Sequence, residues 1–461
     1  MVGAFGLDQA RLDLLRRRRQ GLGERLSAPV LLWSGGRSPR NFPHNLYPYR
    51  ASSHFLYFAG IPIEQAVIRL ESGRLELFMA DPSPTDALWH GPSPTREQWA
   101  TQIGAEAAYP LSELGSHAAD ALTVGVQDAA TRIQQSRLLN REVPPTPALH
   151  PLDEPLAQAL VDLRLTHDAF ALQEMRQAAA VTVAAHKAGM AASLQAKGEA
   201  QVRAAMEQVI CAQQMSPAYS SIVTVHGDVL HNEAHHHPLQ PGDLLLADVG
   251  AESPLGWAAD VTRTWPVSGH FSSTQRDLYE VVRQAHDACI AKAAPGVEYR
   301  DLHLLAATVI AAGLVELGIL RGDPDTLVAR DAHALFFPHG VGHLLGLDVH
   351  DMEDLGDRAG YAPGRRRSER FGLGYLRLDR PLQAGMVVTI EPGFYQVPTI
   401  LQDPERRQRY ADCVHWERLA QFADVRGIRI EDDVLITPTG CEVLTAALPT
   451  HPEAIEAWVW G

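Results

Sequence analysis

The sequence predicts an α/β (α+β) protein of two domains, a smaller one over residues 1–160 and a larger one over residues 161–461. Three observations lead to this prediction. Short apolar runs typical of strands alternate with longer stretches in which apolar residues recur at helical spacing. Five prolines fall between residues 144 and 155, and proline-rich connectors usually lie between folded units. In the second half, strand-like runs recur with an acidic residue at their ends.

The amino-terminal domain should begin with an amphipathic helix over residues 7–26, with Arg16 to Arg19 on its solvated face. Residues 30–33 (VLLW) predict a strand. Residues 66–79 (AVIRLESGRLELFM) predict a hairpin that turns at Ser72 and Gly73. Strands and helices continue to alternate as far as TVGVQ at residues 123–127, which indicates an α/β domain.

The carboxy-terminal domain shows a coarse internal duplication. Helices are expected at residues 156–195, 200–214, 274–294 and 300–320. One half offers LLLADVG and ADVTRTW, and the other offers VVTIEPG and GIRIEDD, so each half has two strand-like runs and two acids. Two α/β halves that face each other across a metal would produce this pattern.

Composition excludes several classes of function. A formal net charge of −15 disfavours nucleic acid and anionic membranes as partners, because both reward a basic surface. The four cysteines are far apart and form no CxxC pair, so free thiols in a reducing cytosol are expected. We find no signal peptide and no apolar run of membrane-spanning length. A cytoplasmic protein is the resulting prediction.

Three histidines and four acids are candidates for a metal site. Residues 336–351 (FFPHGVGHLLGLDVHD) contain His339, His343 and His350. Buried charges at strand ends are costly unless they are paired or bind a cation. Any single acid of this kind can instead be a strand-end residue that faces water. The set as a whole favours a dinuclear site of oxygen ligands with one imidazole, suited to Mn²⁺ or Zn²⁺. Its acids are Asp248, Asp260, Glu391 and Glu431.

Seven segments together resemble the Xaa-Pro aminopeptidases (aminopeptidase P) of the pita-bread metallopeptidase family, which also holds prolidases, methionine aminopeptidases and creatinase. They run in family order from about residue 46 to about residue 445. The segments are YPYRASSHFLYFAG, AYSSIV, GDLLLADVG, ADVTRTWPVSG, FFPHGVGHLLGLDVHD, TIEPGFY and GIRIEDDVLIT. The resemblance implies a creatinase-like amino-terminal domain followed by a pita-bread catalytic domain.

The resemblance also implies roles for individual residues. Two divalent metal ions are expected. Mn²⁺ is the preferred assignment, and Zn²⁺ and Co²⁺ are the alternatives. The implied ligands are Asp248, Asp260, His343, Glu391 and Glu431. Glu391 matches the general base, and His350 and His231 match histidines that contact the substrate and the tetrahedral intermediate. The implied substrate-binding residues are His339, Tyr395 and Arg429, the last also placed to hold a ligand carboxylate.

The amino-terminal match is less complete. His54 stands where the family pattern places an aspartate, whereas Trp89 and Arg164 fit the pattern. In the family this region reaches into a neighbouring subunit's active site. The resemblance therefore implies a homodimer or homotetramer.

The implied activity is removal of the N-terminal residue from small peptides with proline in the second position. Prolidase, which cleaves Xaa-Pro dipeptides with the same ligands, is the alternative among hydrolases. The alternative from another class is a binding protein that keeps the fold without metal. In such a protein the metal-ligand residues would be missing from the sequence.

Two insertions depart from the family pattern, near residues 355–383 and 398–425. Both lie between implied metal ligands, so both are expected at the mouth of the active site. Their basic clusters, Arg365 to Arg367 and Arg406 to Arg409, are suited to a substrate carboxylate. We therefore expect the insertions to narrow the site and to favour short peptides, with surface or subunit-contact decoration as the alternative.

Overall fold

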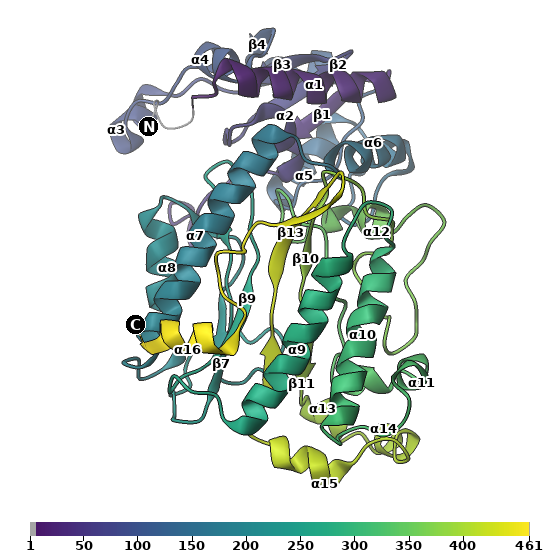
Figure 1. Cartoon of the computed structure of the whole chain (residues 1–461). Coiled ribbons are helices and arrows are strands. Elements are labelled where there is room, and N and C mark those ends of the chain that lie inside the picture. Colours follow the sequence, from purple (N-terminus) through teal and green to yellow (C-terminus); the bar gives the residue numbers. More distant parts are fainter. Residues whose placement is uncertain (1–5, 461) are drawn as a thin grey trace. The chain divides into compact units, whose positions relative to one another are not determined.

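The computed structural model describes residues 6–460 and divides into two compact units (Figure 1). One unit comprises the chain up to Phe170 together with a short later segment, Met352–Ala359. The other comprises Ala171–Asp351 and Gly360–Gly461. The domain boundary expected between residues 160 and 161 stays a prediction.

The first unit is built on a four-stranded sheet in the order β1-β2-β3-β4. The strands are β1 (Val30–Trp33), β2 (Val67–Glu71), β3 (Arg74–Phe78) and β4 (Ala107–Tyr109). Strands β2 and β3 form the predicted hairpin, in which Ser72 and Gly73 both have positive φ, 51° and 80°. A two-residue turn of this kind requires that conformation at both positions, and glycine adopts it without strain. Residues 123–127 form no strand, and only a single bridge joins Leu122 to Val30.

Within residues 6–168, this unit has six helices, together with short 3₁₀ turns at Leu111–His117 and Pro151–Asp153. They are α1 (Gln9–Arg25), α2 (Ser53–Ala59), α3 (Pro84–His90), α4 (Arg96–Ile103), α5 (Ala129–Leu138) and α6 (Glu154–Arg164). Most pack an apolar face against their neighbours. Helix α3 is different, because none of its residues is buried.

The prediction that Arg16 to Arg19 form a solvated face of α1 is wrong for two of the four. Arg18 and Arg19 are 5% and 1% exposed. Arg18 forms a two-pronged ion pair with Asp168, with both distances 2.8 Å. Arg19 donates to the carbonyl oxygens of Phe58, Ile103 and Gly104, so it closes the carboxy-terminal ends of α2 and α4. These guanidinium groups are buried because each finds several acceptors in the interior.

The segment Met352–Ala359, called the strap below, completes the first unit. It contains a 3₁₀ turn (Glu353–Leu355) and the start of α12 (Asp357–Gly360). Arg164 Nη1 donates to His54 Nδ1 at 2.8 Å, and the opposite ring nitrogen lies 3.0 Å from Asp354 Oδ2. Since arginine can only donate, the His54 Nδ1 atom accepts and Nε2–H donates to Asp354. His54 thus joins helix α2 to the strap.

The second unit contains two three-stranded antiparallel sheets, β6-β7-β9 and β10-β13-β14, and two small strand pairs, β5-β8 and β11-β12. The strands of its first half are β5 (Ser216–Pro217), β6 (Ile222–Thr224), β7 (Leu244–Asp248), β8 (Ala251–Glu252) and β9 (Thr262–Pro266). Those of its second half are β10 (Val387–Ile390), β11 (Gly393–Tyr395), β12 (Gly427–Arg429), β13 (Asp432–Thr437) and β14 (Gly440–Val443). Each half thus supplies one three-stranded sheet.

Long helices form near the predicted ranges 200–214, 274–294 and 300–320, and α9 and α10 lie side by side (Figure 1). The range 156–195 is instead divided between α6 of the first unit and α7. The helices are α7 (Ala169–Ser193), α8 (Glu199–Ala212), α9 (Ser273–Lys292), α10 (Tyr299–Glu316), α11 (Pro324–Ala329), α13 (Pro398–Leu401), α14 (Pro404–Arg409), α15 (Trp416–Leu419) and α16 (Pro452–Trp460). Further 3₁₀ turns lie at Ala332–Leu335 and Ala420–Phe422. Within residues 6–460, no helix combines the length and the apolar character that crossing a membrane requires.

Candidate active site

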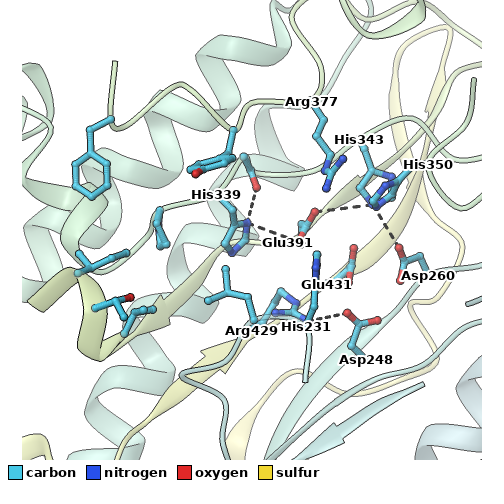
Figure 2. A pocket seen from close by; sticks show the side chains of 18 of the residues that line it. His231, Asp248, Asp260, His339, His343, His350, Arg377, Glu391, Arg429 and Glu431 are labelled. Atoms are coloured by element: carbon cyan, nitrogen blue, oxygen red, sulfur yellow. Dashed lines mark hydrogen bonds and ion pairs between the residues drawn. The ribbon is translucent and has the colours of Figure 1, made fainter. Parts of the chain in front are cut away.

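A pocket of about 700 Å³ in the second unit brings most of the predicted site residues together (Figure 2). Nine of the ten line it: His231, Asp248, Asp260, His339, His343, His350, Glu391, Arg429 and Glu431. The tenth, Tyr395, is fully buried and contacts the lining residue His339 through its hydroxyl group.

The strands explain why four distant acids meet here. Asp248 ends β7, and Asp260 lies two residues before β9, the neighbour of β7. Glu391 follows β10, and Glu431 lies between β12 and β13. The two halves are joined at this point, because the backbone N–H of Glu431 donates to the carbonyl oxygen of Thr262 at 3.0 Å. Short strands that end at the junction therefore deliver their terminal acids to one place.

Three of these residues form a cluster suited to a metal ion. Ligand atoms of Asp260, His343 and Glu431 all lie within 4.8 Å of one another. His343 Nδ1 lies 2.9 Å from the carbonyl oxygen of Leu344, so this nitrogen carries the proton. The opposite nitrogen, Nε2, then faces Asp260 Oδ2 at 3.3 Å. When Nε2 gives up its proton, an imidazole fixed in this way presents a lone pair beside two carboxylates, which fits a divalent cation.

Asp248 and Glu391 share the pocket with this cluster and have other close partners. Glu391 Oε1 lies 3.9 Å from His343 Nε2. The two oxygens of Asp248 accept hydrogen bonds from the Tyr219 hydroxyl and from Arg429 Nη2, both at 2.6 Å. Carboxylate oxygens held at fixed positions beside the cluster are suited to extend it into a second cation site.

Tyr219 is a residue that sequence reasoning missed. Its hydroxyl lies 2.6 Å from Asp248 Oδ1 and 2.5 Å from Asp260 Oδ1. Burial, together with the two acids, raises the pKa of Tyr219 well above its usual value, so the group stays protonated. A hydroxyl has one proton and can donate to only one acid at a time. The segment AYSSIV contributed to the family resemblance, but nothing in it indicated that its tyrosine reaches two acids.

The acids lie close together in a site where the protein interior replaces much of their hydration, so their charges repel one another. Burial raises the pKa of Asp248 to about 6 and that of Glu391 to about 7, and it raises the pKa of Glu431 well above its usual value. Burial acts in the same direction on Asp260, but the hydrogen bond and charge of His343 outweigh it and lower the pKa. Burial would lower the pKa of His343, yet Asp260 raises it. A bound cation would relieve this repulsion.

Arg429 connects the acids to Tyr395, which in turn contacts the lining residue His339. Its Nη2 donates to Asp248, its Nε to Thr262 Oγ1 at 3.0 Å, and its Nη1 to the Tyr395 hydroxyl at 3.1 Å. Thr262 in turn donates to Glu431 Oε2 at 2.7 Å. One guanidinium group therefore orients two of the acids, the first directly and the second through a threonine.

The same chain of hydrogen bonds fixes His339. Because Tyr395 accepts from Arg429, its own proton is donated to His339 Nε2, 2.8 Å away. His339 Nδ1 lies 2.7 Å from the carbonyl oxygen of Gly340 and carries the ring's proton. Burial lowers the pKa of His339 to about 3, in agreement with a neutral ring. Both ring nitrogens are engaged, so His339 offers the pocket the surface of its ring.

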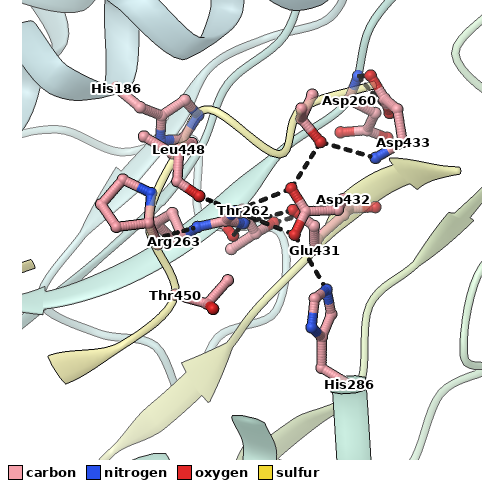
Figure 3. A network of polar contacts seen from close by, with 12 residues as sticks. His186, Asp260, Thr262, Arg263, His286, Glu431, Asp432, Asp433, Leu448 and Thr450 are labelled. Carbon is pink, nitrogen blue, oxygen red and sulfur yellow. Dashed lines mark hydrogen bonds and ion pairs between the residues drawn. The ribbon is translucent and has the colours of Figure 1, made fainter. Parts of the chain in front are cut away.

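A buried network of ion pairs and hydrogen bonds contacts the backbone of two of the acids, Asp260 and Glu431 (Figure 3). Arg263 is fully buried, donates to the carbonyl oxygen of Glu431 at 2.6 Å and pairs with Asp432 at 2.8 Å. His286 Nε2 lies 3.1 Å from the other oxygen of Asp432. Asp433 accepts from the backbone N–H of Asp260 at 3.2 Å. These contacts fix the backbone that carries Asp260 and Glu431.

Both insertions contribute to the wall of the pocket. The first supplies Arg367, Phe371, Tyr375 and Arg377, and the second supplies Thr399, Ile400 and Arg406. Arg377 lies near His343 and Glu391 (Figure 2). The prediction for Arg365 is wrong, because this side chain is held by Glu298 and Asp379 and does not line the pocket.

Comparisons with known proteins agree with the geometry. The model of metallopeptidase family M24 matches residues 173–438, and that of the aminopeptidase P N-terminal domain matches residues 15–128. The Xaa-Pro aminopeptidase of Escherichia coli (strain K12) is 30% identical over 474 residues, which cover 96% of each chain. A probable Xaa-Pro aminopeptidase of Fusarium vanettenii is 30% identical over 428 residues, which cover 90% of this chain and 87% of the relative.

Solved structures show the same similarity. Aminopeptidase PepP of Pseudomonas aeruginosa has a TM-score of 0.80 at 29% identity, covering 97% of this chain and 98% of that one. Aminopeptidase P of E. coli with the inhibitor Pro-Leu has a TM-score of 0.79 at 29% identity and the same coverage. These findings confirm the resemblance drawn from the sequence segments and the predicted two-part fold, with its amino-terminal domain and pita-bread domain.

Proposed function

Because this chain belongs to metallopeptidase family M24, we propose that it is an Xaa-Pro aminopeptidase, which removes the N-terminal residue from peptides with proline in the second position. One observation carries this proposal. Four acids, three of them buried and Glu391 partly exposed, converge with a histidine in a pocket whose wall also contains His231, His339 and His350. This combination supplies cation ligands and polar groups for a peptide in the same enclosed space.

We propose that two divalent ions bind here. Mn²⁺ is the preferred assignment, and Zn²⁺ and Co²⁺ are the alternatives. A zinc-substituted form of E. coli aminopeptidase P is among the similar structures, at 28% identity and a TM-score of 0.76. The proposed ligands are Asp248, Asp260, His343, Glu391 and Glu431. When bound, such ions polarise the scissile carbonyl group and lower the pKa of water. Tyr219, Thr262 and Arg429 orient the ligand carboxylates.

Glu391 is the proposed general base. It takes a proton from the attacking water on a carboxylate oxygen and then transfers it to the leaving nitrogen of proline. A general base must lie within reach of the water that it activates. Glu391 lines the same pocket as the other proposed ligands, and its Oε1 lies 3.9 Å from His343 Nε2, which supports this assignment.

The histidines are proposed to bind and orient the peptide. His231 and His350 would donate to the oxygen that becomes negative as the carbonyl carbon turns tetrahedral. His339, fixed as a neutral ring by Tyr395 and Gly340, would pack its face against the proline ring. Arg429 is proposed to act mainly by holding Asp248 and Tyr395 in place.

Two alternatives predict different results. A prolidase would cleave Xaa-Pro dipeptides in preference to longer peptides. A metal-free binding protein would lack ligands, whereas all five proposed ligands are present in the pocket. The prolidase alternative has some support in the arginines of the pocket wall, because a dipeptide carries its carboxylate close to the scissile bond.

The decisive assay measures release of the N-terminal residue by purified protein with Mn²⁺ added. Its substrates are Ala-Pro, Ala-Pro-Ala and Ala-Ala-Ala. Cleavage of Ala-Pro-Ala, with little of Ala-Ala-Ala, is the expected result. Cleavage of Ala-Pro alone would make the protein a prolidase. No cleavage of either proline peptide at full metal occupancy would contradict the proposal.

We also propose a homodimer or homotetramer in the cytoplasm. Helix α3 exposes Leu88 and Trp89 at 77% and 75%, and large apolar side chains on a helix without buried residues are typical of an interface. The four cysteines are free, which agrees with a reducing compartment. Light scattering coupled to gel filtration would test the assembly, with Trp89→Ser expected to weaken it. A monomeric wild-type protein would contradict it.

A further inference from the structure

Each insertion places one arginine of its basic cluster in the wall of the pocket, namely Arg367 and Arg406. Other arginines of the same clusters are occupied elsewhere. Arg365 pairs with Glu298, and the guanidinium of Arg407 lies 4.0 Å from the ring centroid of Trp416. The clusters as a whole therefore do not face the pocket, but one cationic side chain of each does.

Neighbouring groups hold both guanidinium groups in place. The Arg406 guanidinium lies 4.7 Å from the ring centroid of Phe371, so the second insertion packs against the first at this point. Arg406 Nη1 also lies 3.1 Å from Asp403. Arg367 Nη1 donates to the carbonyl oxygen of Leu376 at 3.0 Å, and its guanidinium lies 5.4 Å from the Tyr361 ring centroid. These contacts restrict the side chains, which lowers the entropy cost of binding a ligand.

The two arginines stand in a pocket whose other charged residues are mostly acids. Two bound cations would offset the charge of Asp248, Asp260, Glu391 and Glu431, and a peptide carboxylate would then be attracted by the arginines. A pocket of about 700 Å³ is of the size that encloses a drug-sized ligand, comparable to a tripeptide. Arg367, Arg406 and the four acids line this one pocket, so a peptide with its scissile bond at the acids can extend its third residue along the wall that carries the arginines.

We propose that Arg367 and Arg406 form a subsite for a carboxylate carried by the residue that follows proline. This inference rests on the Xaa-Pro aminopeptidase function proposed above. The carboxylate has two sources, the C-terminus of a tripeptide or an acidic side chain at the third position. Arginine binds either through paired N–H···O contacts. The subsite makes the two insertions a determinant of substrate choice.

The test compares kcat/KM for four peptides that share Ala-Pro. They are Ala-Pro-Ala as the free acid, Ala-Pro-Ala amide, Ala-Pro-Glu amide and Ala-Pro-Gln amide. Wild-type protein should prefer a carboxylate-bearing peptide over its neutral partner by roughly ten- to a hundredfold, mainly through KM, the usual scale for a hydrogen bond to a charged group. The Arg367→Gln/Arg406→Gln double variant should bring this ratio close to one. The Arg367→Lys/Arg406→Lys double variant should keep part of the preference for carboxylate-bearing peptides.

The chain offers a charge-matched control. Arg366 and Arg409 belong to the same two clusters, are exposed and do not line the pocket. The Arg366→Gln/Arg409→Gln variant removes the same charge and should keep the wild-type ratio. Arg377 stays unchanged in all variants. An equal loss in the control would show a general field effect and would overturn the subsite.

The remaining outcomes separate this inference from the proposed function. Equal cleavage of charged and neutral peptides by the wild type would overturn the subsite and leave the aminopeptidase function intact. Failure to cleave any of the four at full metal occupancy would overturn the function itself. A preference confined to the free acid would assign the subsite to the C-terminus, whereas a preference that includes Ala-Pro-Glu amide would extend it to acidic side chains.

Discussion

Replacement of Tyr219 by phenylalanine removes one oxygen atom from the centre of the proposed metal site. The ring can stay in place, but Asp248 and Asp260 lose the hydroxyl group that lies within 2.6 Å of both. Arg429 still holds Asp248, and His343 still faces Asp260. The change therefore tests one orienting contact rather than the ligands themselves.

The expected magnitude follows from that contact. A hydrogen bond to a charged acceptor contributes about 1.5–3 kcal/mol, which corresponds to roughly ten- to a hundredfold in an equilibrium constant. Substitution of groups that orient metal ligands lowers metal affinity by about the same factor. We therefore expect Tyr219→Phe to raise the Kd for Mn²⁺ by roughly ten- to a hundredfold, with restored turnover at high Mn²⁺ concentration.

Titration calorimetry of the metal-free protein with Mn²⁺ measures this effect directly. Tyr279→Phe is the matched control, because Tyr279 is fully buried and donates its proton to the carbonyl oxygen of Thr450 at 2.9 Å. That variant should lose about 1 kcal/mol of stability and keep its metal affinity. An unchanged Kd in Tyr219→Phe, or equal losses in both variants, would refute the orienting role.

Three further predictions concern the acids. Asp260→Asn should remove activity and at least one equivalent of metal, and elemental analysis that shows two ions with full turnover would contradict this. Glu391→Gln should lower kcat by at least about two orders of magnitude while the fold persists, the scale expected for a general base; a near wild-type rate would exclude that role. For pH, carboxyl groups whose pKa is raised by folding lose their stabilising effect as pH rises through the folded value. Folding raises the pKa of Asp248 from 3.8 to about 6 and that of Glu391 from 4.5 to about 7, so the Tm of the metal-free protein should fall between about pH 4 and 7 and level off above that range. The gain in Tm on adding Mn²⁺ should grow over the same range, and a gain independent of pH would contradict this.

The acids were predictable because each interrupts or ends an apolar run. A charge next to VVTI or LLLA must either face water or be paired with a cation in the interior. Because the pattern recurs four times, it favours a shared cation site. The hairpin at Ser72 and Gly73 was predictable from its turn residues. Local patterns of this kind carry their structural reason within a few residues.

What the sequence did not reveal depends on contacts between distant segments. The burial of Arg18 and Arg19 rests on acceptors that lie up to 150 residues away. Tyr219 follows β5, which pairs with β8, and β8 lies between Asp248 and Asp260 in the chain; no local pattern encodes this pairing. The arginine clusters looked uniform, yet only Arg367 and Arg406 face the pocket. Side-chain direction in an irregular segment is set by its partners and not by its composition.

The strap has a consequence for attempts to recombine this protein with its relatives. Met352–Ala359 folds with the first unit, although the chain on both sides of it belongs to the second. Exchanging residues 1–170 for those of a homologue would therefore leave the strap facing foreign partners. His54 and Asp354 would have to be exchanged together, because each satisfies the other. A functional chimaera therefore needs three crossover points: one after residue 170 and one on each side of the strap. The crossover before the strap lies within two residues of His350.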